Sequence, residues 1–294
     1  MVQTPTPNNA REFVMQIKTS LSLFALAMVT ATSAWAQHEP DTTLQFGIVP
    51  QQSALKLAQN WIPMLHYLSE KTGYTLRFRT APNIPEFEKR VGEARYDIAY
   101  MNPYHYTVFG QTPGYRAFAK QQDKRIKGLM VVRKDSPITA LQELSGKALA
   151  FPAPAAFAAS VLPRSQLAQQ GIRFDAHYVS SHDSVYRSVA KGLFTAGGGI
   201  QRTLGNVDPQ IRAQLKVLWT TEGYTPHAFA ARPGLDSVMV QKLQQAMLNM
   251  AQDSAAQPLL KALNFKGLVV AHHEDWDDVR QLHVEERLGR LIGQ

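Results

Sequence analysis

Residues 96–104, YDIAYMNPY, contain the pattern on which the fold class depends. Residues 96–101 are mostly apolar and β-prone, and the Asn-Pro pair at 102–103 ends the run. A short apolar run that ends in turn residues is typical of a strand buried on both faces. The stretch therefore predicts an interior strand with a polar loop at its carboxyl end.

The segments before this strand alternate between strand and helix patterns. Ser53 is a candidate N-cap, apolar residues then recur at spacings of three and four, and Gly73 stops the helix. The predicted elements are a strand at 44–49, a helix from 54 to 72, a strand at 76–79 and a helix at 85–94. Together with the strand at 96–101 they form a βαβαβ half-domain.

The next hundred residues repeat this alternation and predict a second α/β unit. Its elements are strands at 148–151, 178–180, 193–196 and 216–219, with helices at 155–170 and from 182 onward. The final third, at 237–251, 257–263 and 276–292, is predicted to be helical and to return to cover the first unit.

These units predict an α/β fold of two lobes with mainly parallel sheets, joined by a two-stranded hinge. We expect residues 128–133 and 226–232 to be the two hinge crossings. Lobe 1 then comprises residues 37–130 plus 228–294, and lobe 2 comprises residues 131–227. Ligands of open α/β sheets bind at the carboxyl ends of strands, so the cleft between the lobes is the predicted site.

Residues 15–36, MQIKTSLSLFALAMVTATSAWA, have the pattern of a secretory signal peptide. One Lys precedes a short apolar core, and Ala34-Trp35-Ala36 supplies the small residues needed for cleavage. We expect residues 1–36 to be removed after Ala36, with translation starting at Met15. The chain contains no cysteine, and so neither disulfides nor a lipid-bearing Cys, which favours a soluble protein of the periplasm.

Charge and motifs argue against several function classes. The formal net charge is +8, but the charges are spread out and no nucleic-acid motif is present. No Gly-x-Ser-x-Gly elbow, Walker loop, His-Glu-x-x-His or Cys nucleophile occurs, so we predict no enzyme activity, no catalytic residue and no cofactor. The run 272–275, HHED, is better explained as a capped helix start than as a metal site.

Several motifs resemble those of the phosphate/phosphite/phosphonate-type periplasmic substrate-binding proteins of ABC transporters. They run from about Leu44 to Val270, and their order and spacing carry the likeness: FGIVP, YLSEKTGY, YDIAYMNPYHY, SPITALQELSGKALAFPAP, Leu162-Pro163, SSHDSVYRSVAKG and KVLW. The resemblance implies the type II periplasmic binding protein fold. It also implies capture of a solute and its delivery to a membrane permease.

The resemblance also points to site residues, with departures from the family pattern. The hydroxyl cluster expected before the second-lobe helix is replaced by Ala156-Phe157-Ala158, and the aromatic position after Asp-Ile-Ala falls at Met101, next to Tyr100. Arg202 stands where aminophosphonate binders have a carboxylate, whereas His182 matches the family pattern. Asn102, Tyr104 and Gly198 are further candidates for ligand binding, because they lie at or after the end of a predicted strand.

Structural roles remain open for these candidates. The glycines at 197–199 suit a tight turn, His182 suits the start of a helix, Arg202 suits a surface ion pair, and the aromatic residues suit packing.

We conclude that the sequence predicts a monomeric periplasmic binding protein for a small-molecule ligand, with an ABC permease as partner and no nucleic acid. Its pocket is expected to be phosphonate-binding-like but less polar. The alternatives are a ligand sensor that partners a membrane histidine kinase and a binder of an apolar or aromatic metabolite. A periplasmic hydrolase is the least favoured.

Overall fold

The structure is a computed structural model that describes residues 42–289 and 291. The predicted signal peptide and its cleavage site lie outside the described residues. In the first half of the chain the elements are β1 (Thr43–Ile48), α2 (Ala54–Thr72), β2 (Thr75–Arg79), α3 (Ile84–Gly92), β3 (Ile98–Met101), α4 (Pro103–Phe109), β4 (Arg116–Gln121), β5 (Leu129–Arg133), η1 (Leu141–Leu144) and β6 (Ala148–Phe151).

The second half continues with the π-helical turn η2 (Phe157–Val161), α5 (Leu162–Gln169), β7 (Asp175–Tyr178), α6 (His182–Ala190), β8 (Ala196–Gly199), α7 (Gln201–Asn206), α8 (Pro209–Ala213), β9 (Leu215–Thr220), β10 (Ala228–Ala231), α9 (Ser237–Asn249), α10 (Gln257–Ala262), β11 (Leu268–Val270), η3 (His273–Trp276), α11 (Asp277–Arg280) and α12 (Val284–Leu288).

Two sheets define two lobes, as the sequence predicts. The first has the strand order β11-β4-β10-β3-β1-β2 and the second β7-β6-β8-β5-β9. Both are mixed rather than mainly parallel: β1 pairs parallel with β2 and β3, and β6 with β7 and β8, whereas the strands near each crossing pair antiparallel. The reason is that the chain leaves each lobe and returns to it, which reverses the strand direction.

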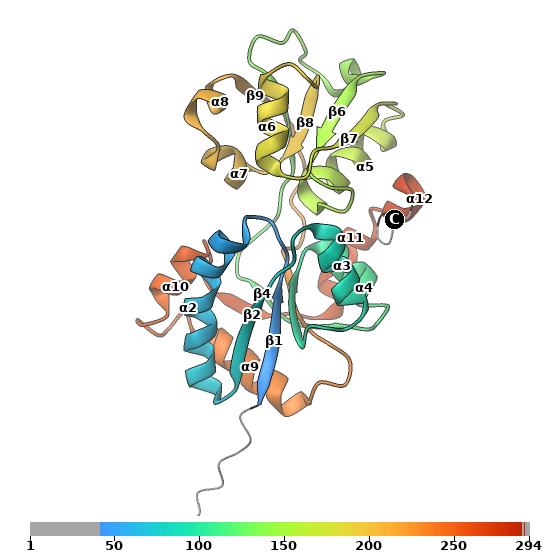
Figure 1. Ribbon diagram of the computed structural model, residues 1–294. Helices are drawn as coiled ribbons and strands as arrows, with labels where there is room; N and C mark the ends of the chain where they lie inside the picture. Colours follow the sequence, from blue (N-terminus) through green and yellow to red (C-terminus); the bar gives the residue numbers. More distant parts are fainter. Residues whose placement is uncertain (1–41, 290, 292–294) are drawn as a thin grey trace, which may run out of the picture. The chain divides into compact units, whose positions relative to one another are not determined.

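Helices cover both faces of the first sheet. Figure 1 shows α2, α9 and α10 on one side of this sheet and α3, α4 and α11 on the other. Helix α2 begins at Ser53, whose hydroxyl accepts a hydrogen bond from the amide of Lys56, and it ends at Gly73 in the left-handed region. Strand β3 is buried along its whole length, as its apolar sequence requires.

The second sheet is also buried on both faces. Alternate residues of β5 belong to different apolar clusters, because successive side chains of a strand point to opposite faces. Met130 and Val132 pack with Leu149, Phe151 and Leu167 in one cluster. Leu129 and Val131 pack on the opposite face, in a cluster that includes Tyr186, Val189 and Leu204.

The two crossings between the lobes differ from the predicted ones. Residues 122–128 connect β4 to β5, and residues 221–227 connect β9 to β10. The two segments pair at Ile126 and Tyr224, whose backbone groups exchange hydrogen bonds of 2.7 and 2.9 Å. The predicted crossing at 128–133 instead consists mostly of strand β5, and the one at 226–232 consists mostly of strand β10. Their apolar sequences suit the sheet interior, and the polar residues before them span the gap.

The glycines at 197–199, for which a place in the cleft wall and a tight turn were the two predictions, lie in strand β8. A Cβ atom on Gly198 would lie 1.8 Å from the carbonyl oxygen of Ala159, and one on Gly128 would lie 1.9 Å from that of Ala158. The glycines therefore allow η2 to pack its backbone directly against the second sheet.

The predicted C-terminal helix at 276–292 is interrupted. His283 adopts a left-handed conformation, with φ of +47°, and separates α11 from α12. Helix α11 packs against α4 of the first lobe, whereas α12 packs against α5 of the second. The C-terminal segment therefore contacts both lobes.

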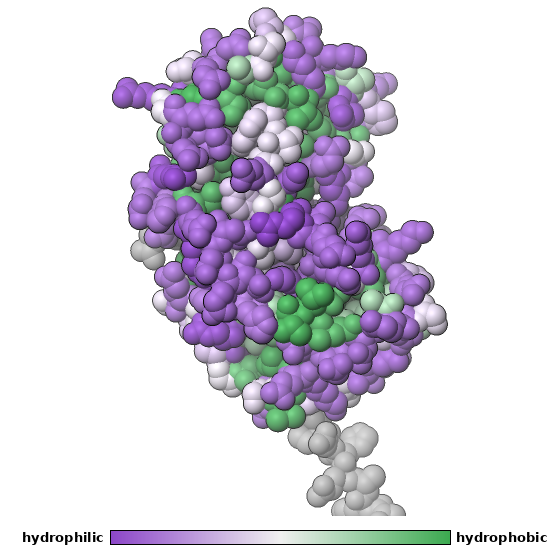
Figure 2. Space-filling view, turned by 180° about the vertical axis from the view of Figure 1, so that it is seen from behind, coloured by the Kyte–Doolittle hydropathy of each residue, from purple (hydrophilic) through white to green (hydrophobic). Residues whose placement is uncertain are grey.

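The surface seen in Figure 2 is mainly hydrophilic, with hydrophobic residues in smaller areas. The most exposed large apolar side chains, Leu55, Leu193 and Val238, belong to separate segments. None of the described helices combines the length and apolar character that a membrane crossing needs.

Candidate ligand-binding site

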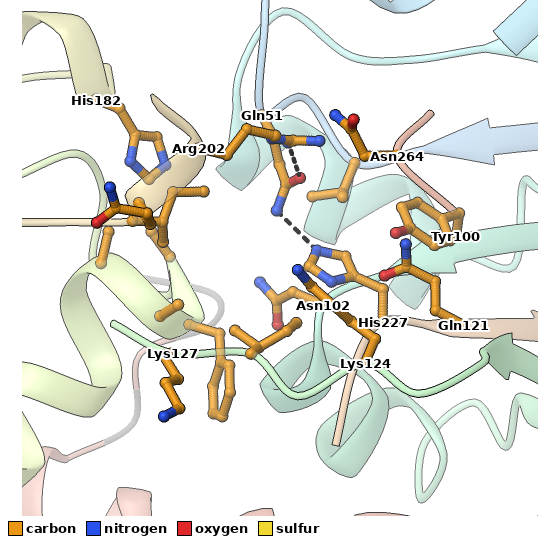
Figure 3. Close-up of a pocket in the computed structure, with 18 of the residues that line it drawn as sticks. Gln51, Tyr100, Asn102, Gln121, Lys124, Lys127, His182, Arg202, His227 and Asn264 are labelled. Atoms are coloured by element: carbon orange, nitrogen blue, oxygen red, sulfur yellow. Dashed lines mark hydrogen bonds between the residues drawn. The ribbon is translucent and has the colours of Figure 1, made fainter. Parts of the chain in front are cut away.

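A cavity of about 300 Å³ lies where the two lobes meet, and residues from both lobes line it (Figure 3). The first lobe contributes the carboxyl ends of β1 and β3 and the loop after α10, and the second contributes the starts of η2, α6 and α7. Both crossings also reach it. Its volume is at the lower end of the range for small-molecule pockets.

The charge of the cavity is positive. Lys124, Arg125, Lys127 and Arg202 line it, and no Asp or Glu is found among its described lining residues. Arg125 is held by an ion pair of 2.8 Å between Nη2 and Oδ2 of Asp278. The helix starts add partial positive charge, because their first amide groups point along the helix axis. The arrangement favours an anion.

Gln51 links the two lobes across the cavity (Figure 3). Nη2 of Arg202 donates to its Oε1 at 3.2 Å, and its Nε2 lies 2.7 Å from Nε2 of His227. Burial, helped by Arg202, lowers the pKa of His227 to about 3. The neutral ring accepts from the Gln51 amide at Nε2, so its proton is on Nδ1.

Aromatic rings and a second histidine complete the polar side. The ring of Tyr100 stacks on His227, with centroids 4.9 Å apart, and burial raises the pKa of the Tyr100 phenol. Burial, again with a contribution from Arg202, lowers the pKa of His182 to about 4. Both imidazoles are therefore neutral at pH 7 and able to donate or accept one hydrogen bond at each nitrogen.

The opposite wall is apolar and comes from η2. Ala156, Phe157, Ala158 and Ala159 line the cavity and are all buried. The Phe157 ring meets that of Tyr224 edge to face, at 6.0 Å between centroids. The cavity is thus basic and rich in amides on one side and apolar on the other.

Asn102 has a structural role at the edge of the cavity. Its Oδ1 accepts from the His105 amide at 2.8 Å and caps α4, and its Nδ2 donates to the Ala155 carbonyl of the other lobe at 3.0 Å. Asn102 therefore helps to hold the η2 loop against the first lobe.

The structure brings most of the predicted residues together. The predicted residues that line the cavity are Tyr100, Asn102, Ala156, Phe157, Ala158, His182 and Arg202. Three others do not line it. Met101 points to the opposite face of β3 from Tyr100, Tyr104 lies on α4 beside a separate cavity next to α11 and α12, and Gly198 is covered by η2.

Comparison with protein families agrees with this geometry. The model of the family described as "ABC transporter, phosphonate, periplasmic substrate-binding protein" matches residues 46–276. The chain belongs to this family.

Relatives of this binding protein align with most of its length. The phosphate-import protein PhnD of Mycolicibacterium smegmatis is 22% identical, over 72% of this chain and 73% of the relative. A binding protein of a Pseudomonas aeruginosa phosphonate transporter superimposes with a TM-score of 0.75 at 19% identity, over 83% and 86% of the two chains. PhnD1 of Prochlorococcus marinus, in complex with methylphosphonate, gives 0.74 at 19%, over 82% and 97%.

Part of the cavity lining of this binding protein was not predicted from the sequence. The missed residues with polar side chains include Gln51, Gln121, Lys124, Lys127, His227 and Asn264. Gln51 follows β1 just as Asn102 follows β3, so the same rule would have found it. Lys124 and Lys127 lie in a crossing that the sequence placed too late, and no local pattern marks them.

The HHED run has a structural explanation in this binding protein. The Asp275 carboxylate accepts a hydrogen bond of 2.7 Å from the His272 amide at the start of η3. Among the described residues, no group of three or more His, Asp or Glu side chains is arranged to hold a metal ion.

Proposed function

We propose that this protein captures a small organic anion with a phosphonate or phosphate head group and delivers it to an ABC permease. The observation that carries the proposal is the interlobe cavity, whose described lining residues include four cationic side chains and no carboxylate. A doubly charged head group is most favourable where several cations and helix starts converge.

We place the head group between Lys124, Arg202 and the start of η2. Lys124 lies in the crossing that leaves the first lobe and Arg202 lies on α7 of the second lobe, so an anion that contacts both stabilises the closed arrangement. Backbone amides at the start of η2 replace the hydroxyl groups that Ala156 and Ala158 lack. The side chains of this segment suit an apolar substituent next to the head group.

Substrates with an ammonium group should bind poorly. Among the part of the lining that the structure describes, no carboxylate compensates a positive charge, and Lys124, Lys127 and Arg202 would repel it. The proposal therefore separates methylphosphonate from 2-aminoethylphosphonate, which differ mainly by an aminomethyl group.

The test is isothermal titration calorimetry with methylphosphonate, phosphate and 2-aminoethylphosphonate. Methylphosphonate or phosphate should bind, and 2-aminoethylphosphonate should bind at least about tenfold more weakly than methylphosphonate. Lys124→Ala should weaken the binding of the anions, and Lys147→Ala, which changes an exposed lysine outside the cavity, should not. Tight binding of 2-aminoethylphosphonate would contradict the proposed pocket chemistry.

A further inference from the structure

A second cavity of about 210 Å³ adjoins the first and is called here the outer chamber. Lys56, Asn60 and Trp61 of α2 and Asn206 of α7 line it but not the first cavity. Residues of both lobes thus enclose it. The two cavities share Gln51 and Arg202, so they meet at the hydrogen bond that joins these side chains.

Side-chain amides make up much of the polar lining of the outer chamber. Gln51, Gln52, Asn60, Asn206 and Asn264 all line it. Each amide offers both hydrogen-bond donors and an acceptor, and so matches a hydroxyl group, which has both functions. A carboxylate selects a cation and a guanidinium selects an anion, whereas neutral amides select neither.

Its floor is aromatic. Trp61 is almost fully buried and its ring lies 4.7 Å from that of Tyr100, between centroids, and 5.9 Å from that of Phe265. A lining that combines aromatic rings with amides suits a substituent that carries both C–H groups and hydroxyl groups. The charged residues among the described lining of the chamber are Lys56 and Arg202, whose positive charges exclude a cationic substituent.

We propose that the outer chamber is a subsite for a neutral, hydroxylated substituent of the anion. The inference rests on the proposed function, because the head group is taken to occupy the first cavity. The ligand is then a phosphonate or phosphate monoester with a polyol-like substituent that passes the Gln51–Arg202 contact. Asn60 and Asn206 are the residues that determine specificity for this substituent.

Calorimetry with matched probes tests the subsite. Glycerol 3-phosphate should bind at least about tenfold more tightly than n-propyl phosphate, which has the same chain without hydroxyl groups. Asn60→Ala should remove most of this advantage and leave the affinity for propyl phosphate within about twofold. Gln59→Ala, on the same helix but lining neither cavity, should change neither affinity.

Other outcomes are equally informative. Asn206→Ala provides a second variant if Asn60→Ala lowers the melting temperature. The phosphonate analogue 3,4-dihydroxybutylphosphonate, compared with glycerol 3-phosphate, distinguishes a phosphonate from an ester as the preferred ligand. Equal affinities for glycerol 3-phosphate and propyl phosphate would overturn the subsite alone. Failure of every phosphate and phosphonate probe to bind would overturn the proposed function, and the subsite with it.

Discussion

Replacing Arg202 by Ala tests the electrostatics of the cleft most directly. Arg202 is exposed and its guanidinium donates to Gln51 across the cavity at 3.2 Å. A hydrogen bond from a charged group to an anion contributes about 1.5–3 kcal/mol, so Arg202→Ala should weaken anion binding by roughly tenfold to more than a hundredfold. Unfolding free energy should change by less than about 0.5 kcal/mol, because the side chain is not packed in a core.

A second measurement separates an electrostatic role from a structural one. Arg202 contributes, after burial, to the low pKa values of His182 and His227. In Arg202→Ala both pKa values should therefore rise, which NMR titration of the histidine ring protons can follow. Lys191→Ala, which removes an exposed cation of the same lobe that lines neither cavity, is the matched control. A sharply lower melting temperature with unchanged affinity would show that Arg202 is a structural residue.

Three further predictions concern motion, packing and pH. Spin labels at Leu55 and Gly205, on helices that line the outer chamber, should approach each other when ligand saturates the protein, and an unchanged distance would argue against closure. Gly198→Ala should cost about 3 kcal/mol or more in urea unfolding, because the new Cβ would meet the Ala159 carbonyl; a stable variant would refute this account of η2. Because burial lowers the pKa of His227 from 6.5 to about 3, the unfolded chain binds this proton at higher pH, so stability should be full above about pH 6.5 and fall as the pH drops toward 3. His227→Gln should flatten this dependence, and identical pH curves for variant and wild type would contradict it.

Local patterns were sufficient for most of the fold. Apolar runs located β1, β3 and β6, and the cap at Ser53 with the stop at Gly73 located α2. These features depend on neighbouring residues alone, so a single sequence contains them. The mixed character of the sheets was missed, because strand direction depends on where the chain crosses between lobes.

The site was only partly predictable for a similar reason. Residues that follow strands, such as Asn102, were predicted by position and line the cavity, whereas the predicted Met101 does not line it because its side chain points to the other face of β3. The triplet at 197–199 was predicted to line the cleft or to form a tight turn, because glycine suits both, but here it lies in a strand where η2 requires the missing side chains. Lys124 and His227 enter the cavity only because two distant crossings pair, a contact that no local pattern encodes.

The contact between α12 and α5 restricts how the lobes can move. The paired crossings at Ile126 and Tyr224 already form one pivot, and Leu282 and Arg287 line a cavity together with Tyr224 and residues of α5. With these attachments on one side of the cleft, we expect the lobes to rotate about a hinge on that side, so that the cleft opens on the opposite side. Gln51 and Arg202, at the boundary with the outer chamber, would then travel farthest and meet last. Closing would bring these two side chains together over a head group that is already bound. The final step of capture would then depend on the substituent of the ligand that extends into the outer chamber.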